Sequence, residues 1–319
     1  SSGKRHENST PACVSSPPPV LTDTLINRVE DPEMKSVLCE VQKGHTEDVS
    51  KLSAYEVVRL GDMLLLEALH QMGMSWNISE NGTTPAHWAA QKGKLEVLKF
   101  LCDVRGNGDP NVEDQSGCVP MHLAAYEGHP ECIEMLCNSG ASLDVQNKNG
   151  KAPAHYAASK GHLECISTLC RLGASLDIQD RDGMTPVHLA ALEGHSECIE
   201  HLHSSDDTLL YTQNSIGATP DHLAAHNKHL NCVKTLVNLG ASLCIRDMHG
   251  DTPAHLAVYS NCPECISAIH ESNDAKAMNM RDMDGRAPIH IAAHECHLAC
   301  IQALCSAGVK LDIREKKGL

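Results

Sequence analysis

Cysteine and histidine offer the most chemistry in this 319-residue chain, which contains 16 and 21 of them. A His-x-x-Cys spacing recurs five times and could place an imidazole and a thiolate on one zinc ion: His129 and Cys132, His162 and Cys165, His195 and Cys198, His229 and Cys232, His297 and Cys300. Cys262-Pro263-Glu264-Cys265 holds the same place as a Cys-x-x-Cys. Zinc requires four ligands converging at about 2.0–2.3 Å. Packed helices stand about 8–10 Å apart, so one His and one Cys per layer do not close a site. We interpret the pairs as scaffold, with the Cys in the core, and expect no metal and no cofactor.

The second possible interpretation of these residues is a catalytic Cys–His pair. A nucleophile is usually a single residue that is activated by a partner in a pocket, whereas here each histidine has equivalents along the chain. Cys118, Cys262 and Cys296 depart from the pattern and are the better candidates for exposed, reactive thiols. Gly106-Asn107-Gly108-Asp109 lacks the Lys and Ser/Thr of a phosphate-binding loop. We therefore predict that the chain is not an enzyme.

The elements that position these residues follow a repeat with a period near 33. Glycine recurs at steps of 33 to 35 residues. Three residues later comes Pro, two after that His, and two after that Ala. The seven histidines are His87, His122, His155, His188, His222, His255 and His290. Such self-similarity is the sequence signature of a stacked repeat protein.

The repeat resembles the ankyrin family. The segment from Asp182 to His195, with the sequence DGMTPVHLAALEGH, and the repeat end Leu172-Gly173-Ala174-Ser175-Leu176-Asp177 carry this resemblance, which extends over about 48–319. It implies an all-α solenoid in which each repeat is a β-hairpin loop, two antiparallel helices and a return loop. It also implies that the Pro-x-His histidine bonds to backbone between repeats, and that partners bind on the concave face and at the hairpin tips.

The residue types agree with this fold on physical grounds. Asp-Gly or Asn-Gly at the tips supplies positive φ without steric cost. Thr-Pro begins the first helix, with Thr expected as the cap and Pro in the first turn. Ala-Ala permits close helix packing, and Gly-His marks the turn between the helices.

The predicted domain organisation has four parts. Residues 1–20 form a disordered Pro/Ser-rich leader, and 21–80 form a helical N-terminal cap with one helix in 21–43 and a degenerate repeat after it. Residues 81–314 form seven repeats. Residues 315–319 are either the start of a further repeat hairpin or a C-terminal end.

Composition restricts the partner and the compartment. Lys and Arg number 26 against 41 Asp and Glu, a net charge of -15, which disfavours nucleic acid and favours a partner with a basic segment. Unpaired cysteines in a long chain indicate a reducing compartment, the cytoplasm or the nucleus. No apolar run approaches the ~20 residues that span a bilayer, so we expect no membrane association. We expect a monomeric array.

Partner binding should use positions that the repeat leaves free. The two residues before each inter-helix turn vary while their neighbours do not: Gln91 and Lys92, Tyr126 and Glu127, Ser159 and Lys160, Leu192 and Glu193, His226 and Asn227, Tyr259 and Ser260, His294 and Glu295. Tyr126, Leu192 and Tyr259 are the expected anchors. Met248 and Met283 at hairpin tips are a second candidate contact.

Three functions remain to be compared. We favour a protein-binding scaffold or adaptor. The alternative is a targeting or regulatory module of a larger enzyme or channel. A stand-alone enzyme or metal protein is the least favoured hypothesis.

Overall fold

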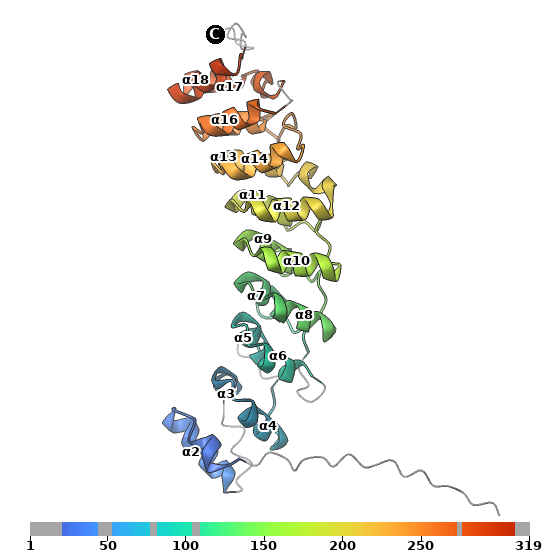
Figure 1. Ribbon diagram of the computed structural model, residues 1–319, viewed down its shortest axis with the longest axis vertical. Coiled ribbons are helices and arrows are strands. Elements are labelled where there is room, and N and C mark those ends of the chain that lie inside the picture. Colours follow the sequence, from blue (N-terminus) through green and yellow to red (C-terminus); the bar gives the residue numbers. More distant parts are fainter. Residues whose placement is uncertain (1–20, 44–52, 77–81, 104–108, 273–275, 310–319) are drawn as a thin grey trace, which may run out of the picture. The chain divides into compact units, whose positions relative to one another are not determined.

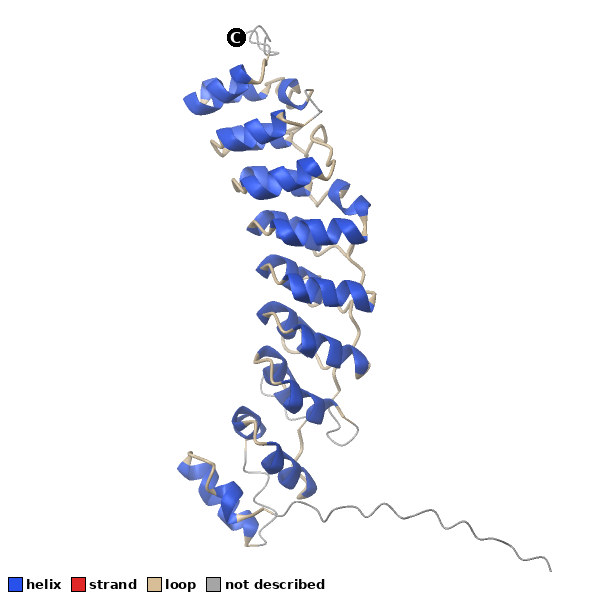
Figure 2. Cartoon of the chain, in the orientation of Figure 1, coloured by secondary structure: helices blue, strands red, loops and turns tan. Residues whose placement is uncertain are grey.

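The computed structural model describes residues 21–43, 53–76, 82–103, 109–272 and 276–309, and every regular element in these ranges is helical (Figures 1 and 2). The chain forms two compact units, residues 1–75 and 76–319. Within the described ranges no helix is long and apolar enough to cross a membrane. The expected leader over 1–20 and the expected hairpin start over 315–319 lie outside the described residues.

The described residues of the first unit form four helices: α1 (Asp23–Ile26), α2 (Pro32–Gln42), α3 (Ala54–Leu60) and α4 (Met63–Gln71). The single helix expected over 21–43 is therefore wrong. Asp31 caps a second start by accepting the Met34 N–H at 2.8 Å, and Pro32 follows it. Because proline inside a helix costs about 3 kcal/mol, the chain ends one helix and begins another here.

The second unit is a stack of seven helix pairs. The first helices are α5 (Pro85–Gln91), α7 (Pro120–Glu127), α9 (Pro153–Lys160), α11 (Pro186–Glu193), α13 (Pro220–His226), α15 (Pro253–Tyr259) and α17 (Pro288–His294). The second helices are α6 (Leu95–Cys102), α8 (Pro130–Asn138), α10 (Leu163–Leu172), α12 (Ser196–Ser205), α14 (Leu230–Asn238), α16 (Pro263–His270) and α18 (Leu298–Ser306). Successive first helices pack on one another, and so do successive second helices, which gives two layers (Figure 1). Two 3-10 turns, η2 (Asp207–Tyr211) and η3 (Ala277–Asn279), follow α12 and α16.

The Pro-x-His histidines join neighbouring repeats, as predicted. In His188 the Nδ1 atom accepts the Thr185 backbone N–H at 3.2 Å, and Nε2 donates to the Ala218 carbonyl of the next repeat at 3.1 Å. Five equivalents donate in the same way at 2.9–3.1 Å: His87, His122, His155, His222 and His255. A carbonyl only accepts and an amide only donates, so both contacts require the neutral ring with its proton on Nε2.

Threonine occupies the N-cap position, as predicted, at Thr84, Thr185, Thr219 and Thr252. The hydroxyl of Thr185 lies 2.8 Å from His188 Nδ1, and the same Nδ1 accepts the Thr185 N–H. The histidine therefore contributes to the cap. It makes the same bond to the N–H of Val119 and Ala152, which hold the N-cap position in two other repeats.

A second histidine joins the repeats at the inter-helix turn. His195 Nε2 donates to the Ser159 carbonyl of the preceding repeat at 3.1 Å, and its ring packs on Gly161. Gly161 has φ +72°, and an added Cβ would lie 2.5 Å from His195 Nδ1. Glycine is therefore required here for its backbone conformation and for the space it leaves.

This glycine position is occupied later by Lys228, at φ 62°. In the following repeat Cys262 replaces the histidine that would have faced it. Here the glycine position gains a side chain and the opposing ring is absent. In the next repeat Asn261, at φ 53°, takes the same position, and there the histidine is retained as His297, which bonds through Nδ1 to the Val258 carbonyl at 2.9 Å. The exchange of a glycine–histidine contact for a lysine–cysteine pair preserves the stack.

The cysteines of the His-x-x-Cys pairs are core residues, as predicted. Cys132, Cys165, Cys198, Cys232, Cys265 and Cys300 are at most 1% exposed. Burial raises the pKa of the Cys165 and Cys232 thiols to about 12, which disfavours the reactive thiolate. The expected exposure of Cys118 and Cys262 is wrong, since they are 6% and 4% exposed; Cys296 is exposed. The equivalent positions are only half-buried in several other repeats, as at Lys151 and His195, so the smaller cysteine side chains are more deeply buried than their counterparts.

Candidate partner-binding surface

The fourteen predicted positions lie at the C-terminal ends of the seven first helices, one pair per repeat. We call them the pair surface. None of them is buried. Tyr126 is 39% exposed, whereas Leu192 and Tyr259 are half-buried. All fourteen side chains are therefore accessible at least in part.

The repeat fixes the backbone of the pair surface and leaves its side chains accessible at least in part. The carbonyl groups of Gln91, Tyr126, Ser159 and Leu192 accept hydrogen bonds from histidines of the next repeat at 2.9–3.1 Å. The side chain of Ser260 is held as well, because its hydroxyl turns inward and donates to the Ala225 carbonyl at 3.0 Å. This anchorage holds the display positions rigidly.

The structure brings four of the predicted residues into contact across repeats. Gln91 Nε2 donates to Glu127 Oε1 at 3.3 Å. Lys160 Nζ lies 4.6 Å from the centre of the Tyr126 ring, a cation–π geometry. Tyr156, on the same helix as Lys160, meets the Tyr126 ring edge-on at 5.8 Å. Repeats one to three therefore present a continuous surface centred on Tyr126.

The environment of Tyr259 differs from that of Tyr126. Burial raises the pKa of the Tyr259 hydroxyl, and Asp251, Asp282 and Arg286 are among its charged neighbours. Arg286 Nε pairs with the buried Asp282 at 2.9 Å. Tyr259 thus lies at an acidic part of the surface.

The hairpin tips carry an apolar ridge, of which the sequence predicted only the two methionines. Met248 and Met283 are 57% and 70% exposed, and Ile216 at the preceding tip is 47% exposed. The tips are in register, since the Met248 N–H donates to the Ile216 carbonyl at 2.9 Å. In two earlier repeats the position of Met248 and Met283 holds a charged residue, Lys148 or Arg181. Aligning Asn214-Ser215-Ile216-Gly217 with the other tips would have identified Ile216.

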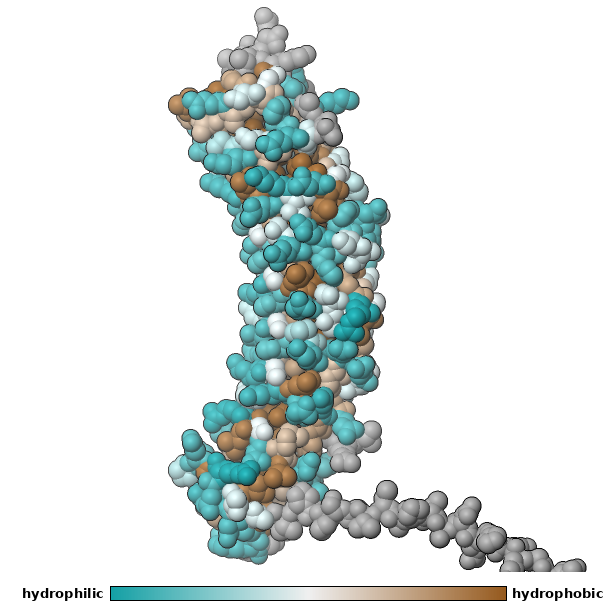
Figure 3. All heavy atoms as spheres, in the orientation of Figure 1, coloured by the Kyte–Doolittle hydropathy of each residue, from teal (hydrophilic) through white to brown (hydrophobic). Residues whose placement is uncertain are grey.

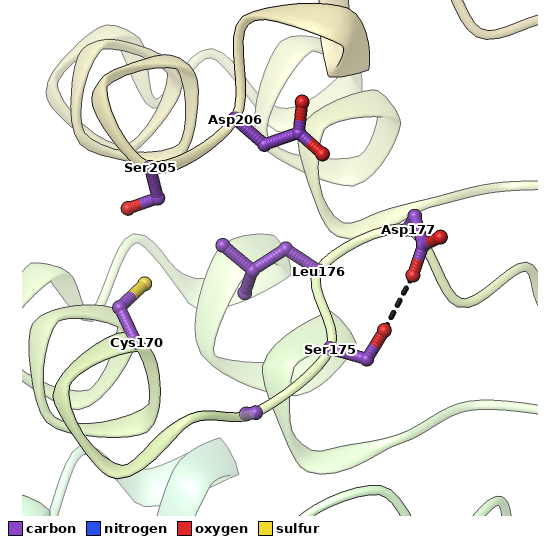
Figure 4. A pocket seen from close by; sticks show the side chains of 7 residues that line it. Cys170, Ser175, Leu176, Asp177, Ser205 and Asp206 are labelled. Carbon is purple, nitrogen blue, oxygen red and sulfur yellow. Dashed lines mark hydrogen bonds between the residues drawn. The ribbon is translucent and has the colours of Figure 1, made fainter.

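Elsewhere the visible surface is mainly polar, with separated apolar patches (Figure 3). A pocket of about 410 Å³ lies where α12 ends without the usual Leu-Gly-Ala. It is lined by Cys170, Ala174, Ser175, Leu176, Asp177, Ser205 and Asp206 (Figure 4). The Ser175 hydroxyl donates a hydrogen bond to the Asp177 carboxylate. Asp206 caps η2 by accepting the Thr208 N–H at 2.9 Å. These groups already have structural partners. The described part of the chain holds no group of three or more His, Cys, Asp or Glu side chains placed to bind a metal ion.

Comparison with known proteins agrees with this geometry. The family model for ankyrin repeats matches residues 54–147, 139–209, 172–247, 206–279 and 222–317. The chain belongs to the ankyrin repeat family. It is similar to the crystal structure of the human ASB11 ankyrin repeat domain, with 27% identity and a TM-score of 0.59 over 70% of this chain and 98% of that one. A search of curated proteins finds no significant match. Ankyrin repeats are generally protein–protein interaction modules and are typically non-catalytic.

Proposed function

We propose that this chain is an intracellular scaffold or adaptor that binds a partner protein or peptide across the pair surface. The observation that carries the proposal is the combination of locked carbonyl groups with accessible side chains at Gln91, Tyr126 and Leu192. A surface that is already ordered loses little conformational entropy on binding. The apolar tips Ile216, Met248 and Met283 extend the proposed surface.

The charge of the chain favours a partner with a basic segment. The net charge is -15, and Glu127, Glu193 and Glu295 lie on the pair surface with acidic neighbours around Tyr259. Opposite charge accelerates encounter and selects against acidic partners, nucleic acid included. We propose a monomeric array that acts in the cytoplasm or nucleus, where its many free thiols stay reduced.

A binding experiment with a matched control tests the site. The intact chain is used to isolate a partner, whose Kd is then measured against a variant with Tyr126, Leu192 and Tyr259 all changed to Ala. Hot-spot residues contribute at least ~2 kcal/mol each, so Kd should rise by thirtyfold or more (~30-fold per 2 kcal/mol). The control changes Glu131, Glu164 and Glu197 to Ala, three exposed residues of the second helices α8, α10 and α12.

The control variant should bind with nearly the wild-type Kd, weaker by no more than about fivefold, because three carboxylates on the second helices contribute only screened long-range attraction to a basic partner. Unchanged binding by the triple Tyr126, Leu192 and Tyr259 variant would remove the pair surface as the site. Equal loss in both variants would show that the effect is not specific to the first helices.

A further inference from the structure

The start of α16 carries two thiols where five other repeats carry an imidazole and a thiol. Cys262 is the N-cap of this eight-residue helix, and Cys265 is in its first turn. Residues three apart on a helix face one another, with Cβ atoms about 5–6 Å apart. Cys262 has a non-helical backbone conformation, at φ -119° and ψ 81°, as an N-cap residue does. The two thiols influence one another's ionisation across this short separation.

The surroundings favour negative charge on Cys262. The neighbouring Cys265 thiol is the largest influence, and the Lys228 ammonium adds a smaller one from the preceding repeat. The unpaired N–H groups at a helix N-terminus act in the same sense. Against the opposing effects of burial and of Glu264, whose Oε2 lies 3.9 Å from the Cys262 sulfur, these influences lower the pKa of Cys262 to about 7.

The pair is asymmetric. The neighbouring Cys262 thiol and full burial raise the pKa of Cys265, so the proton stays on Cys265 while Cys262 ionises. Cys262 retains 4% exposure and Cys265 has none, so a small oxidant meets Cys262 first. A charged sulfur in contact with a protonated one is the arrangement of an attacking and a resolving thiol.

We propose that Cys262 and Cys265 form a redox dithiol that hydrogen peroxide converts to an intramolecular disulfide and that a small thiol such as glutathione reduces again. The Cys262 thiolate attacks one peroxide oxygen, the O–O bond breaks, and the departing hydroxide takes a proton to become water. Cys262 is then a sulfenic acid. The Cys265 sulfur attacks the Cys262 sulfur, the S–O bond breaks, and the hydroxyl leaves as water with the Cys265 proton. The two sulfurs lose two electrons in total, and the peroxide gains them.

Two substitutions isolate this pair from the exposed thiols. Cys296 and Cys305 are exposed, so the test uses the full chain carrying Cys296→Ser and Cys305→Ser. The chain is treated with hydrogen peroxide, remaining thiols are alkylated, and disulfides are located by peptide mass mapping. The first product should link Cys262 to Cys265, and reduced glutathione should restore both thiols. A first disulfide between Cys262 and Cys300, or a chain in which Cys262 and Cys265 stay reduced while other cysteines oxidise, would overturn the proposal.

A rate measurement tests the activation of Cys262 separately. Cys265→Ala removes the thiol beside Cys262, so the pKa of Cys262 should return toward 9. At pH 7 the thiolate fraction then falls about fiftyfold, and the greater nucleophilicity of the more basic thiolate recovers roughly tenfold. Alkylation of Cys262 by iodoacetamide should therefore slow about five- to tenfold. Cys232→Ala, which removes a core thiol of the preceding repeat, is the control. An equal rate in the Cys265→Ala variant and this control would contradict the role given to Cys265.

Discussion

The Nε2 atom of His188 lies 3.1 Å from the carbonyl oxygen of Ala218, thirty residues further along the chain. On the other side of the ring Nδ1 accepts the Thr185 N–H. A proton on Nδ1 would point at this N–H, and the hydrogen bond would be lost. Burial lowers the pKa of His188 from 6.5 to about 4, more than its hydrogen bonds raise it. The joint between repeats four and five therefore depends on a neutral imidazole.

Replacing His188 with Ala should cost less stability in acid than at neutral pH. A histidine whose folded pKa is depressed contributes stability that is present above its unfolded pKa of 6.5 and is lost as pH falls toward about 4. At pH 7.5 the variant leaves buried polar groups unpaired, a cost of about 3 kcal/mol. At pH 5 the wild-type chain has itself lost about 2 kcal/mol through this group, so the difference should shrink by that amount. Urea unfolding at the two pH values measures it.

The exposed His226→Ala variant is the control, because its imidazole shares neither of these bonds. A His188→Ala cost that is the same at both pH values would refute the neutral-ring joint.

Asp221 should titrate in the opposite sense. It is the second residue of the first helix, where every other repeat has an apolar residue, and it is 1% exposed. Neither carboxyl oxygen has a well-formed hydrogen bond, and the nearby Thr219 side chain and its own backbone offset only part of the effect of burial. Burial raises the pKa of Asp221 from 3.8 to about 7. A raised carboxyl pKa gives stability that is complete below 3.8 and is lost as pH rises through 7.

Asp221→Ala should therefore stabilise the chain above pH 7. The free energy of unfolding at pH 8 should rise by roughly 2–4 kcal/mol, and the gain should disappear near pH 4. Asp221→Asn separates charge from shape, since it removes the ionisation and keeps the size. Urea midpoints across this pH range that do not move for Asp221→Ala would show that the carboxyl finds a partner.

Much of this architecture could be predicted from the sequence, because each repeat has the same two helices and packs on its neighbours in the same way. The bond from His188 to the next repeat and the burial of Cys165 follow from position alone. Position alone does not explain the error at Cys262. Its counterparts, such as His195, are half-buried, and the smaller thiol of Cys262 is shielded more completely than their rings.

Contacts between neighbouring side chains could not be predicted in this way. The approach of Lys160 to the Tyr126 ring depends on the rotamers of two long side chains in different repeats, which no periodicity encodes. The paired replacement of glycine by Lys228 and of histidine by Cys262 could be recognised only once the structure showed that these two positions face each other across repeats. The sequence therefore predicted the two layers and the accessible positions at the ends of the first helices, and the structure supplied the side-chain pairs.

Gly161→Ala tests the joint at the inter-helix turn. The left-handed backbone costs alanine about 1–2 kcal/mol, and displacing His195 costs about 1 kcal/mol more with its bond to Ser159. We expect a loss of about 2–3 kcal/mol in denaturant unfolding. Combining it with His195→Cys copies the natural Lys228 and Cys262 arrangement, so the double variant should be about 1 kcal/mol more stable than the sum of the single effects predicts. Strict additivity would disprove the steric coupling.

The apolar ridge at the hairpin tips should contribute to partner binding and not to folding. Met248 and Met283 expose most of their side-chain surface, so changing both to Ser should leave the melting temperature nearly unchanged. If a partner covers them, each lost methionine contact removes about 1.5 kcal/mol or more, and Kd should rise at least roughly tenfold per residue. The control changes Lys148 and Arg181, the equivalent tip residues of earlier repeats, to Ser. Against a basic partner this control should bind as well as the wild-type chain or slightly more tightly. Equal affinity of the methionine variant and the wild-type chain would confine the interface to the pair surface.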